Sequence, residues 1–228
     1  PFQLSSYVPG VKSTLKKSAN WYMPGLPYLD GLELRVMPDV STQTAALRSG
    51  SLDFAFFRTT ITPGLELVKT APQLKMGWCP GANPVAFYMR TDKSPFSDVR
   101  VRRAISMAMD REGILQTVFH GKGAVSPTSM PAYFTKYWLP SDQYPAEAKQ
   151  YIQHNPQAAK KLLAEAGYPN GFDVNVDFTA HFPEQPRIAE AVVALLDAIG
   201  IRAKLNPMEY AQYSGIVYQA KYQEAAIS

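Results

Sequence analysis

The stretch from Pro95 to Gly121, PFSDVRVRRAISMAMDREGILQTVFHG, constrains the fold of this chain more than any other segment. The side-chain oxygen of Ser97 or Asp98 can cap a helix N-terminus. Apolar residues then recur at helical spacing and predict one buried face: Val101, Ile105, Ala108 and Met109. Asp110 marks the start of a second helix, and Gly121 can adopt positive φ at its end. The segment therefore predicts two short, capped helices, which are common in α/β domains.

Downstream of this pair, helix and strand patterns alternate, which indicates an α/β sheet. Upstream, the pattern is richer in strands. The strands expected upstream cover residues 11–15, 32–37, 52–57, 73–78 and 85–90, with a helix over 41–48 capped by Ser41 and a helical turn over 65–69. The elements expected downstream, after a loop, are a helix from Pro156 to Gly167, strands over 172–178, 201–205 and 222–227, and helices over 188–199 and 213–217.

Length and composition narrow the class of protein. The chain has 228 residues, enough for one large or two modest domains. No apolar run approaches the roughly 18 residues that a membrane span needs. The net charge of +4 comes from basic residues spread among acidic ones, rather than from the basic stripe with interleaved aromatics that binds nucleic acid. A single cysteine excludes an internal disulfide.

Motifs for catalysis or metal binding are missing from the sequence. There is no G-x-S-x-G, no H-E-x-x-H and no phosphate-binding glycine loop. His120, His154 and His181 are far apart and have no second ligand at metal-binding spacing. Each is expected in a loop or on the surface, although His181 follows a strand end, where α/β proteins place ligand sites. We expect no catalytic residue, no metal and no cofactor.

The helix pair resembles the signature of the family 5 extracellular solute-binding proteins, the peptide, dipeptide, nickel and opine carriers of ABC importers. The matching residues are Pro95, Phe96, Asp98, Arg100, Val101, Arg102, Arg103, Ala104, Ser106, Ala108, Asp110, Arg111, Glu112 and Ile114. A second similar segment is NPQAAKKLLAEAGYPNGF over residues 155–172. A third lies over residues 27–53, with PYLDG at its start and SGSLD at its end.

The resemblance implies an α/β fold of the periplasmic-binding-protein type, type II and two-lobed, present only in part. Family members are considerably longer, so this chain is expected to be a central piece. Residues 1–84 would form part of lobe one, a strand-rich α/β unit, and residues 85–228 part of lobe two. The first crossover between the lobes would run over residues 83–91.

The resemblance also implies where a ligand cleft lies. A carrier needs a cleft that closes by hinge motion and has aromatic walls with a few polar anchors. The candidate wall residues are Phe56, Phe57 and Tyr88, and the candidate residues after the later strand are Thr179 and His181. A plain core role accounts equally well for Phe56 and Phe57, and an ordinary loop role for Thr179 and His181.

The expected function is that of the substrate-binding component of an ABC importer. It would capture short peptides or a similar small solute outside the cytoplasmic membrane of a bacterium, in the periplasm or anchored to the membrane. It would deliver the solute to the permease as a monomer, without enzymatic activity and without binding nucleic acid. The alternative is a sensor domain of the same fold fused to a DNA-binding regulator, and a hydrolase is a third possibility. Peptide as the solute is inherited from the family.

Overall fold

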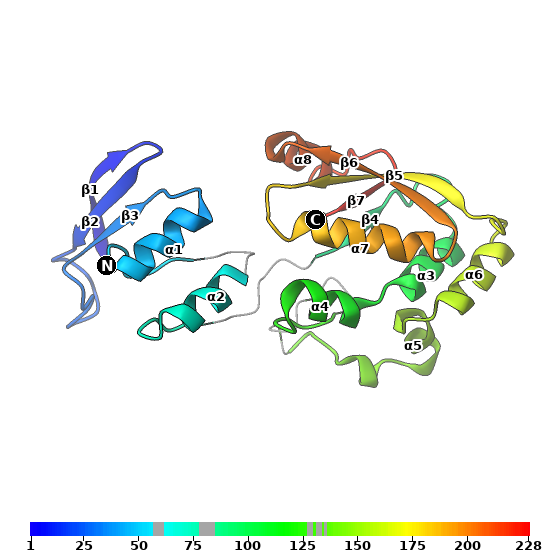
Figure 1. Ribbon diagram of the computed structural model, residues 1–228, viewed down its shortest axis with the longest axis horizontal. Helices are drawn as coiled ribbons and strands as arrows, with labels where there is room; N and C mark the ends of the chain where they lie inside the picture. The colour runs from blue at the N-terminus through cyan, green and yellow to red at the C-terminus, as the bar shows by residue number, and fades with distance from the viewer. Residues whose placement is uncertain (57–61, 78–84, 127–129, 131–133, 135) are drawn as a thin grey trace. The chain divides into compact units, whose positions relative to one another are not determined.

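The computed structural model describes residues 1–56, 62–77, 85–126, 130, 134 and 136–228 (Figure 1). The chain divides into two compact units. The N-terminal unit comprises residues 1–56 and 63–75, and the C-terminal unit comprises residues 57–62 and 76–228. Within the described ranges, no helix combines the length and the apolar character needed to cross a membrane.

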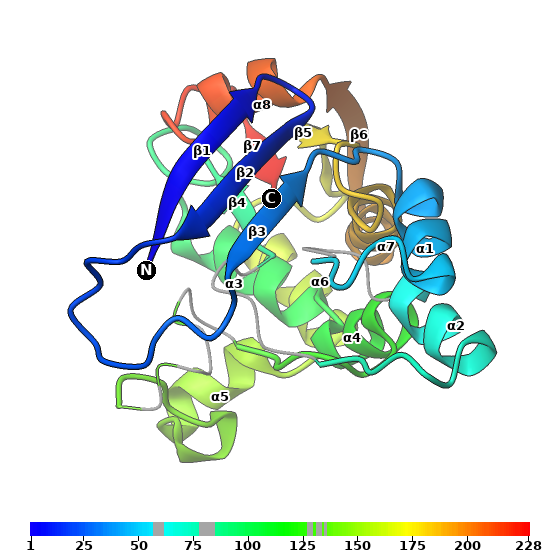
Figure 2. The same cartoon turned by 90° about the vertical axis from the view of Figure 1, so that its left-hand side faces the viewer.

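The N-terminal unit contains a three-stranded antiparallel sheet, which faces the viewer in Figure 2. Its elements are β1 (Phe2–Val8), β2 (Lys12–Lys17) and β3 (Gly31–Arg35), followed by α1 (Val40–Ser49) and α2 (Thr62–Thr70). One face carries Leu4, Leu15 and Leu32, which are directly opposite one another across the three strands. Leu4 is 62% exposed and Leu34 is 57% exposed. Leu15 and Leu32 are half-buried, so the sheet is amphipathic and its apolar face is partly uncovered within the described residues.

Several expectations for this unit are wrong. Residues 52–56 and 73–77 are not strands, and β1 was not expected. A strand needs a partner for its backbone N–H and C=O groups, and local sequence does not supply one. The cap of α1 is Asp39 rather than Ser41. Asp39 accepts hydrogen bonds from the Ser41 hydroxyl and the Thr42 amide, and these hydrogen bonds lower its pKa to about 2.

The C-terminal unit is built on a four-stranded mixed sheet of order β4-β7-β5-β6. The strands are β4 (Phe87–Met89), β5 (Phe172–Thr179), β6 (Ile201–Met208) and β7 (Ala225–Ile227). β5 pairs in parallel with both β6 and β7, whereas β4 pairs antiparallel with β7. Val174, Val176 and Phe178 are buried as expected. The strict alternation ends after Val176, because α8 covers the other face of β5 and Asp177 is buried as well.

Helices cover both faces of this sheet. They are α3 (Val99–Ala108), α4 (Arg111–Phe119), α5 (Ala146–Ile152), α6 (Pro156–Glu165), α7 (Gln185–Asp197) and α8 (Tyr210–Val217), with a 3-10 turn at Ser141–Gln143. In Figure 1, α7, α3, α4 and α6 lie on one side of the sheet, where the main core forms. α8 lies on the other side, where Tyr213 and Val217 pack with Tyr222 and Ala226. Helix α5 falls in the segment that was expected to be a loop.

The two signature helices begin and end largely as predicted. Asp98 caps α3 by accepting a 2.8 Å hydrogen bond from the Arg100 amide, and Asp110 caps α4 by accepting one of 2.8 Å from the Gly113 amide. The predicted face of α3 is buried. Gly121 has φ of +71°, and His120 before it is also left-handed.

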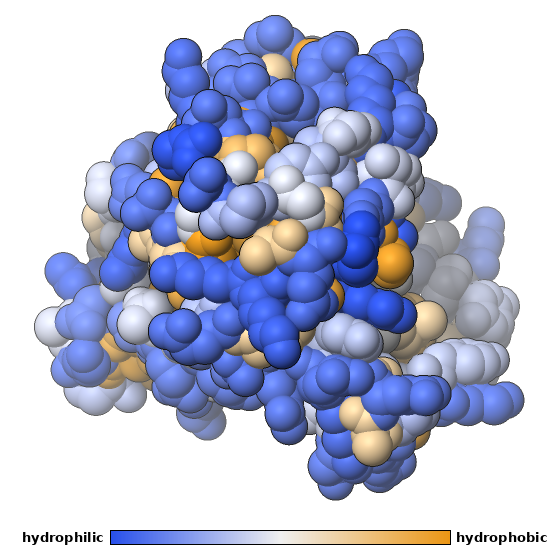
Figure 3. All heavy atoms as spheres, turned by 90° about the vertical axis from the view of Figure 1, so that its right-hand side faces the viewer, coloured by the Kyte–Doolittle hydropathy of each residue, from blue (hydrophilic) through white to orange (hydrophobic). Residues whose placement is uncertain are grey.

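The arginine group of α3 is engaged inside the C-terminal unit. Arg100 pairs with Asp98 at 2.7 Å and donates to the Glu165 carbonyl at the end of α6. Arg102 donates to the Phe96 carbonyl, and the Arg103 guanidinium lies 4.4 Å from the ring centroid of Tyr151. Figure 3 shows the side of the molecule where α3 and α6 lie, and hydrophilic residues dominate it. These arginines therefore tie α3 to its neighbours.

Arg111, the first residue of α4, binds carbonyl groups rather than a carboxylate. Its guanidinium donates to the Ser106 carbonyl at 2.9 Å, to the Ser106 hydroxyl at 2.9 Å and to the Ile152 carbonyl at 3.4 Å. Burial lowers the pKa of this guanidinium. A cation beside the last carbonyls of α3 is favourable because those carbonyls carry partial negative charge. Arg111 thus joins α3, α4 and α5 at one point.

Two glycines allow β5 and β6 to begin side by side. Gly171 has φ of +68°, and a Cβ there would lie 1.7 Å from the Gly200 carbonyl oxygen. Gly200 ends the turn after α7 with φ of +91°. The adjacent first ladder pair is Phe172 with Ile201. The GYPNGF segment therefore sets where the parallel ladder starts.

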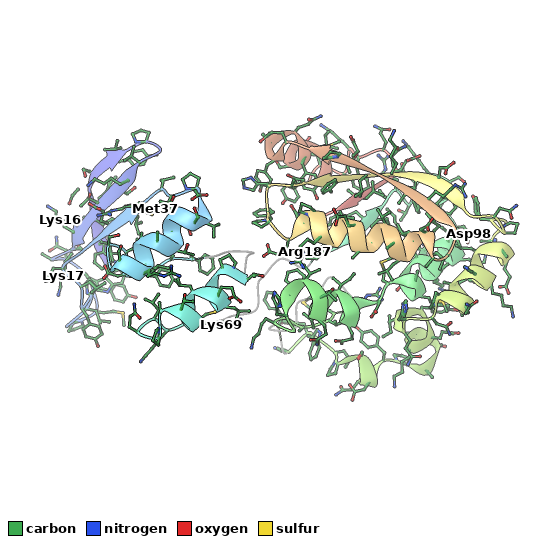
Figure 4. The ribbon with its side chains drawn as sticks, viewed as in Figure 1. Lys16, Lys17, Met37, Lys69, Asp98 and Arg187 are labelled. Carbon is green, nitrogen blue, oxygen red and sulfur yellow. The ribbon has the colours of Figure 1, made fainter. Side chains whose placement is uncertain are left out.

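We predict that Arg111→Ala lowers the free energy of unfolding by roughly 2–4 kcal/mol, because it leaves buried carbonyls without their charged donor. Urea denaturation followed by circular dichroism measures this loss. The matched control is Arg187→Ala, since Arg187 is exposed at the start of α7 and forms no hydrogen bond or ion pair with a described residue (Figure 4). An equal effect of the two substitutions would contradict the role given to Arg111.

Substitution of two glycines should have opposite effects. Gly171→Ala is expected to destabilise by about 3 kcal/mol or more, because its Cβ collides with backbone and φ is positive. Gly215→Ala should stabilise by about 0.5–1 kcal/mol, because Gly215 lies in the interior of α8 and an added Cβ would meet no other segment within 4 Å. Thermal melts of both variants test the pair, and a stable Gly171→Ala protein would refute the close approach.

Candidate functional site

The candidate site lies where the parallel strands of the C-terminal unit end. Thr179 is the last residue of β5, Met208 is the last of β6, and the two are paired in the ladder. β7, parallel to β5 on its other side, ends at Ile227. Because the strands run in the same direction, their carboxyl ends meet at one edge of the sheet. Ligands of open α/β sheets bind at such edges.

Thr179 and His181 are brought together by the turn after β5. Thr179 is 1% exposed, and its hydroxyl accepts a 3.2 Å hydrogen bond from the His181 amide. This is a short side-chain-to-backbone turn that fixes the chain after the strand. The His181 side chain itself is exposed. Thr179 therefore acts on the backbone, while His181 is the residue that meets solvent.

Two aromatic residues that the sequence analysis missed pack against His181. The imidazole of His181 stacks on the ring of Tyr210 with centroids 4.5 Å apart and planes 23° apart. Phe182 packs edge-on against His181 at 4.8 Å and against Tyr210 at 5.7 Å. Tyr210 follows the end of β6 by two residues, as His181 follows the end of β5. The strand expected over residues 201–205 stops three residues short of the end of β6, so the sequence offered no signal for Tyr210.

Tyr88 lies on β4, two strands away from β5. It pairs with Ala226, which pairs in turn with Asp177, so the three residues form a row on one face of the sheet. Thr179 follows Asp177 by two residues and belongs to the same face. Tyr88 is 37% exposed, and its hydroxyl lies 3.3 Å from the hydroxyl of Ser228. Tyr88, Thr179 and His181 thus share one region of the C-terminal unit.

Phe56 and Phe57 are not shown to join this region. Phe56 belongs to the N-terminal unit, is 64% exposed and lies in no strand. The expectation that it lies near the end of a buried strand over residues 52–57 is wrong, because residues 52–56 pair with no strand in the part of the chain that the structure describes. Phe57 lies outside the described residues.

Under α8, polar groups are buried behind the edge. The Tyr213 hydroxyl is buried and donates a 2.6 Å hydrogen bond to the Ile227 carbonyl. Burial raises the pKa of Tyr213, with smaller contributions from Tyr218, Tyr88 and Asp177. Asp177 is 8% exposed and accepts a 2.8 Å hydrogen bond from the Asn206 side-chain amide. The Tyr213 bond fixes α8, and with it Tyr210, against β7, whereas the Asp177 bond joins β5 to β6.

The arrangement offers aromatic rings, an imidazole and hydroxyl groups. Such a set suits reversible binding of a small molecule. Among the described residues, no group of three histidine, cysteine or acidic side chains is placed to hold a metal ion.

Comparison with known proteins gives a consistent result. The family model described as "Bacterial extracellular solute-binding proteins, family 5 Middle" matches residues 1–226. Heme-binding protein A of Haemophilus influenzae is 33% identical over 193 residues, covering 83% of this chain and 33% of that protein. The glutathione-binding protein GsiB of Escherichia coli K12 is 25% identical over 227 residues, covering 100% of this chain and 42% of that protein.

Solved structures agree in fold. The agropinic-acid complex of AgaA from A. tumefaciens R10 superposes with a TM-score of 0.74 at 28% identity, covering 100% of this chain and 44% of that one. DppA of Helicobacter pylori with the peptide STSA gives a TM-score of 0.72 at 26% identity, covering 100% of this chain and 42% of that one. The fold is therefore that of a periplasmic binding protein, present in part. The chain spans less than half of the length of these relatives.

We predict that Tyr213→Phe lowers the free energy of unfolding at neutral pH by about 1–2 kcal/mol, because the Ile227 carbonyl loses its buried donor. The raised pKa adds a pH signature. Because the pKa of Tyr213 is raised in the folded state, the contribution of its neutral hydroxyl to the stability of the fold is complete below the ordinary tyrosine pKa of 10.0. This contribution is lost as the pH rises toward the folded-state pKa. Denaturation at pH 7, 9 and 11 should show a smaller alkaline loss in the variant than in wild type. An identical alkaline loss would contradict the assignment.

Proposed function

This chain belongs to the bacterial extracellular solute-binding proteins of family 5, and from this premise we propose that it is the central part of an ABC-importer carrier. The carrier captures a small solute outside the cytoplasmic membrane and hands it to the permease. Family 5 binding proteins are periplasmic, and we propose the same compartment here, with or without a membrane anchor.

The observation that carries this proposal is the carboxyl edge of the C-terminal sheet. Three of the five candidate residues, Tyr88, Thr179 and His181, lie in this region. Among the described residues, none of them has a partner that would make it a nucleophile or a general base. We propose that the solute contacts His181 and Tyr88, with Thr179 fixing the turn beneath it. The carrier then needs no cofactor and performs no reaction.

We further propose that residues 1–84 belong to lobe one of the carrier and residues 85–228 to lobe two, whereas the main segment of the compact C-terminal unit already begins at residue 76. Phe56 and Phe57 then stay candidate ligand-binding residues of lobe one. The protein acts as a monomer, without nucleic acid.

The solute is proposed as a short peptide or a similar small molecule. The names of the relatives support this range, since they include binding proteins for heme and glutathione and complexes with agropinic acid and a peptide. The hydrogen bonds of Tyr88 and Thr179 favour none of these solutes over the others.

Native mass spectrometry of the intact protein, purified without refolding, tests this function. We expect bound masses in the range of short peptides or one discrete small solute, released on denaturation. His181→Ala should reduce the bound fraction, whereas His154→Ala, an exposed histidine with no ring stacked on it, should not. A protein that carries no solute and gains none from periplasmic extract would overturn the carrier function.

Titration calorimetry with residues 1–228 alone measures how strongly this part of the carrier binds peptides by itself. Because this chain spans only part of its relatives, we expect it to bind peptides much more weakly than the intact protein. Tight peptide binding by residues 1–228 would show that the pocket is placed wrongly.

A further inference from the structure

The ring of His181 is fixed on one side. Tyr210 covers one face of the imidazole with its own ring at 4.5 Å and 23°, and Phe182 contacts both rings by its edge. The three residues come from two segments, the turn after β5 and the first residue of α8. We name His181, Phe182 and Tyr210 the ring platform.

The backbone beneath the ring platform is also fixed. The Thr179 hydroxyl accepts the His181 amide, and the Gln185 amide at the start of α7 donates a 3.0 Å hydrogen bond to the Phe182 carbonyl. Tyr210 directly follows the α8 cap, Glu209, whose carboxylate accepts the Ala211 amide at 2.7 Å. Both segments that carry the rings are therefore anchored by hydrogen bonds on either side of the platform.

An exposed aromatic ring that is already held in one orientation loses little further entropy when a second ring stacks on it. Offset stacking and edge-to-face contacts between rings stabilise beyond the area that they bury. A merely structural histidine would more commonly be covered on both faces or free to rotate. Here, Tyr210 is stacked on one face of the imidazole, and the His181 side chain is still exposed.

We infer that the ring platform is a stacking subsite for a planar, unsaturated group of the solute, such as an aromatic side chain or a heterocycle. The inference rests on the proposed carrier function and narrows its substrate class. His181 contacts the planar group, and Tyr210 is a positioning residue that keeps the imidazole in place. Phe182 restricts both rings from the side.

The ring platform lies wholly within this chain, so its test does not need the rest of the pocket. The probes are N-acetylphenylalanine amide and its saturated counterpart N-acetylcyclohexylalanine amide, which differ in planarity rather than in backbone. The chain has three histidines, and the ring-proton NMR signals of His181 are those missing from His181→Ala. Residues 1–228 are titrated with each probe at millimolar concentration. The signals that shift identify the binding site, and the dependence of the shift on probe concentration gives the relative affinity of the two probes.

The planar probe should shift the His181 signals, leave those of His154 unmoved and bind roughly 2- to 10-fold tighter than the saturated probe. His181→Ala should remove that preference. Unmoved His181 signals, or equal affinities for the two probes, would overturn the subsite. That result would leave the carrier function standing, because native mass spectrometry of bound solute tests the function separately.

The role of Tyr210 has its own readout. Without any probe, Tyr210→Leu should move the His181 ring protons downfield, because they lose the ring current of the tyrosine. It should also reduce the preference for the planar probe, while Tyr210→Phe keeps both properties. Tyr28→Leu, at a tyrosine that is 88% exposed, is the matched control and should change neither. An unchanged His181 spectrum in Tyr210→Leu would refute the positioning role.

Discussion

The parallel ladder between β5 and β6 is the constraint on which the site depends. Its eight pairs run without a break from Phe172–Ile201 to Thr179–Met208, so the two strands end at the same level. A residue that follows the end of β5 by a given number of positions therefore corresponds to the residue that follows the end of β6 by the same number. His181 and Tyr210 each lie two residues beyond those ends, and that is where they stack. A slip of one residue would move every side chain of a strand to the other face and separate the rings. Gly171 and Gly200 start the ladder, because a Cβ at Gly171 would collide with the Gly200 carbonyl and Gly200 itself has positive φ.

The helices contribute through cations placed on carbonyl oxygens. Arg100 reaches the last carbonyl of α6, and Arg111 reaches carbonyls at the end of α3 and of α5. Both use the partial negative charge at a helix C-terminus, which a guanidinium satisfies with several donors at once. Arg100 and Arg111 are thus occupied within the C-terminal unit. The family resemblance rests on residues that fix the position of the helices beside the sheet.

The sequence predicted well those features whose cause is local. The caps Asp98 and Asp110 depend only on near neighbours and are confirmed, and so is the burial of Val174, Val176 and Phe178. The strict alternation fails at Asp177, which is buried under α8, an element distant in sequence. The strands expected over residues 52–57 and 73–78 are wrong where they are described, because an apolar run becomes a strand only when another strand pairs with it. In the candidate site, Thr179 and His181 could be named from one strand end. Tyr210 could not be named without the register of β5 against β6, which is a non-local property.

The two units differ in how they bury apolar surface, and this difference bears on binding. The C-terminal unit has a continuous core across its sheet and helices, whereas the N-terminal sheet leaves Leu4, Tyr7 and Leu34 more than half exposed. A three-stranded sheet without a covered apolar face has little stability of its own. A group stacked on the ring platform alone would likewise keep its outer face in water, whereas small-molecule sites bury most of the ligand surface. Tight binding therefore requires a second wall over the platform, and a carrier that gains its affinity from that wall can release its solute by moving it away.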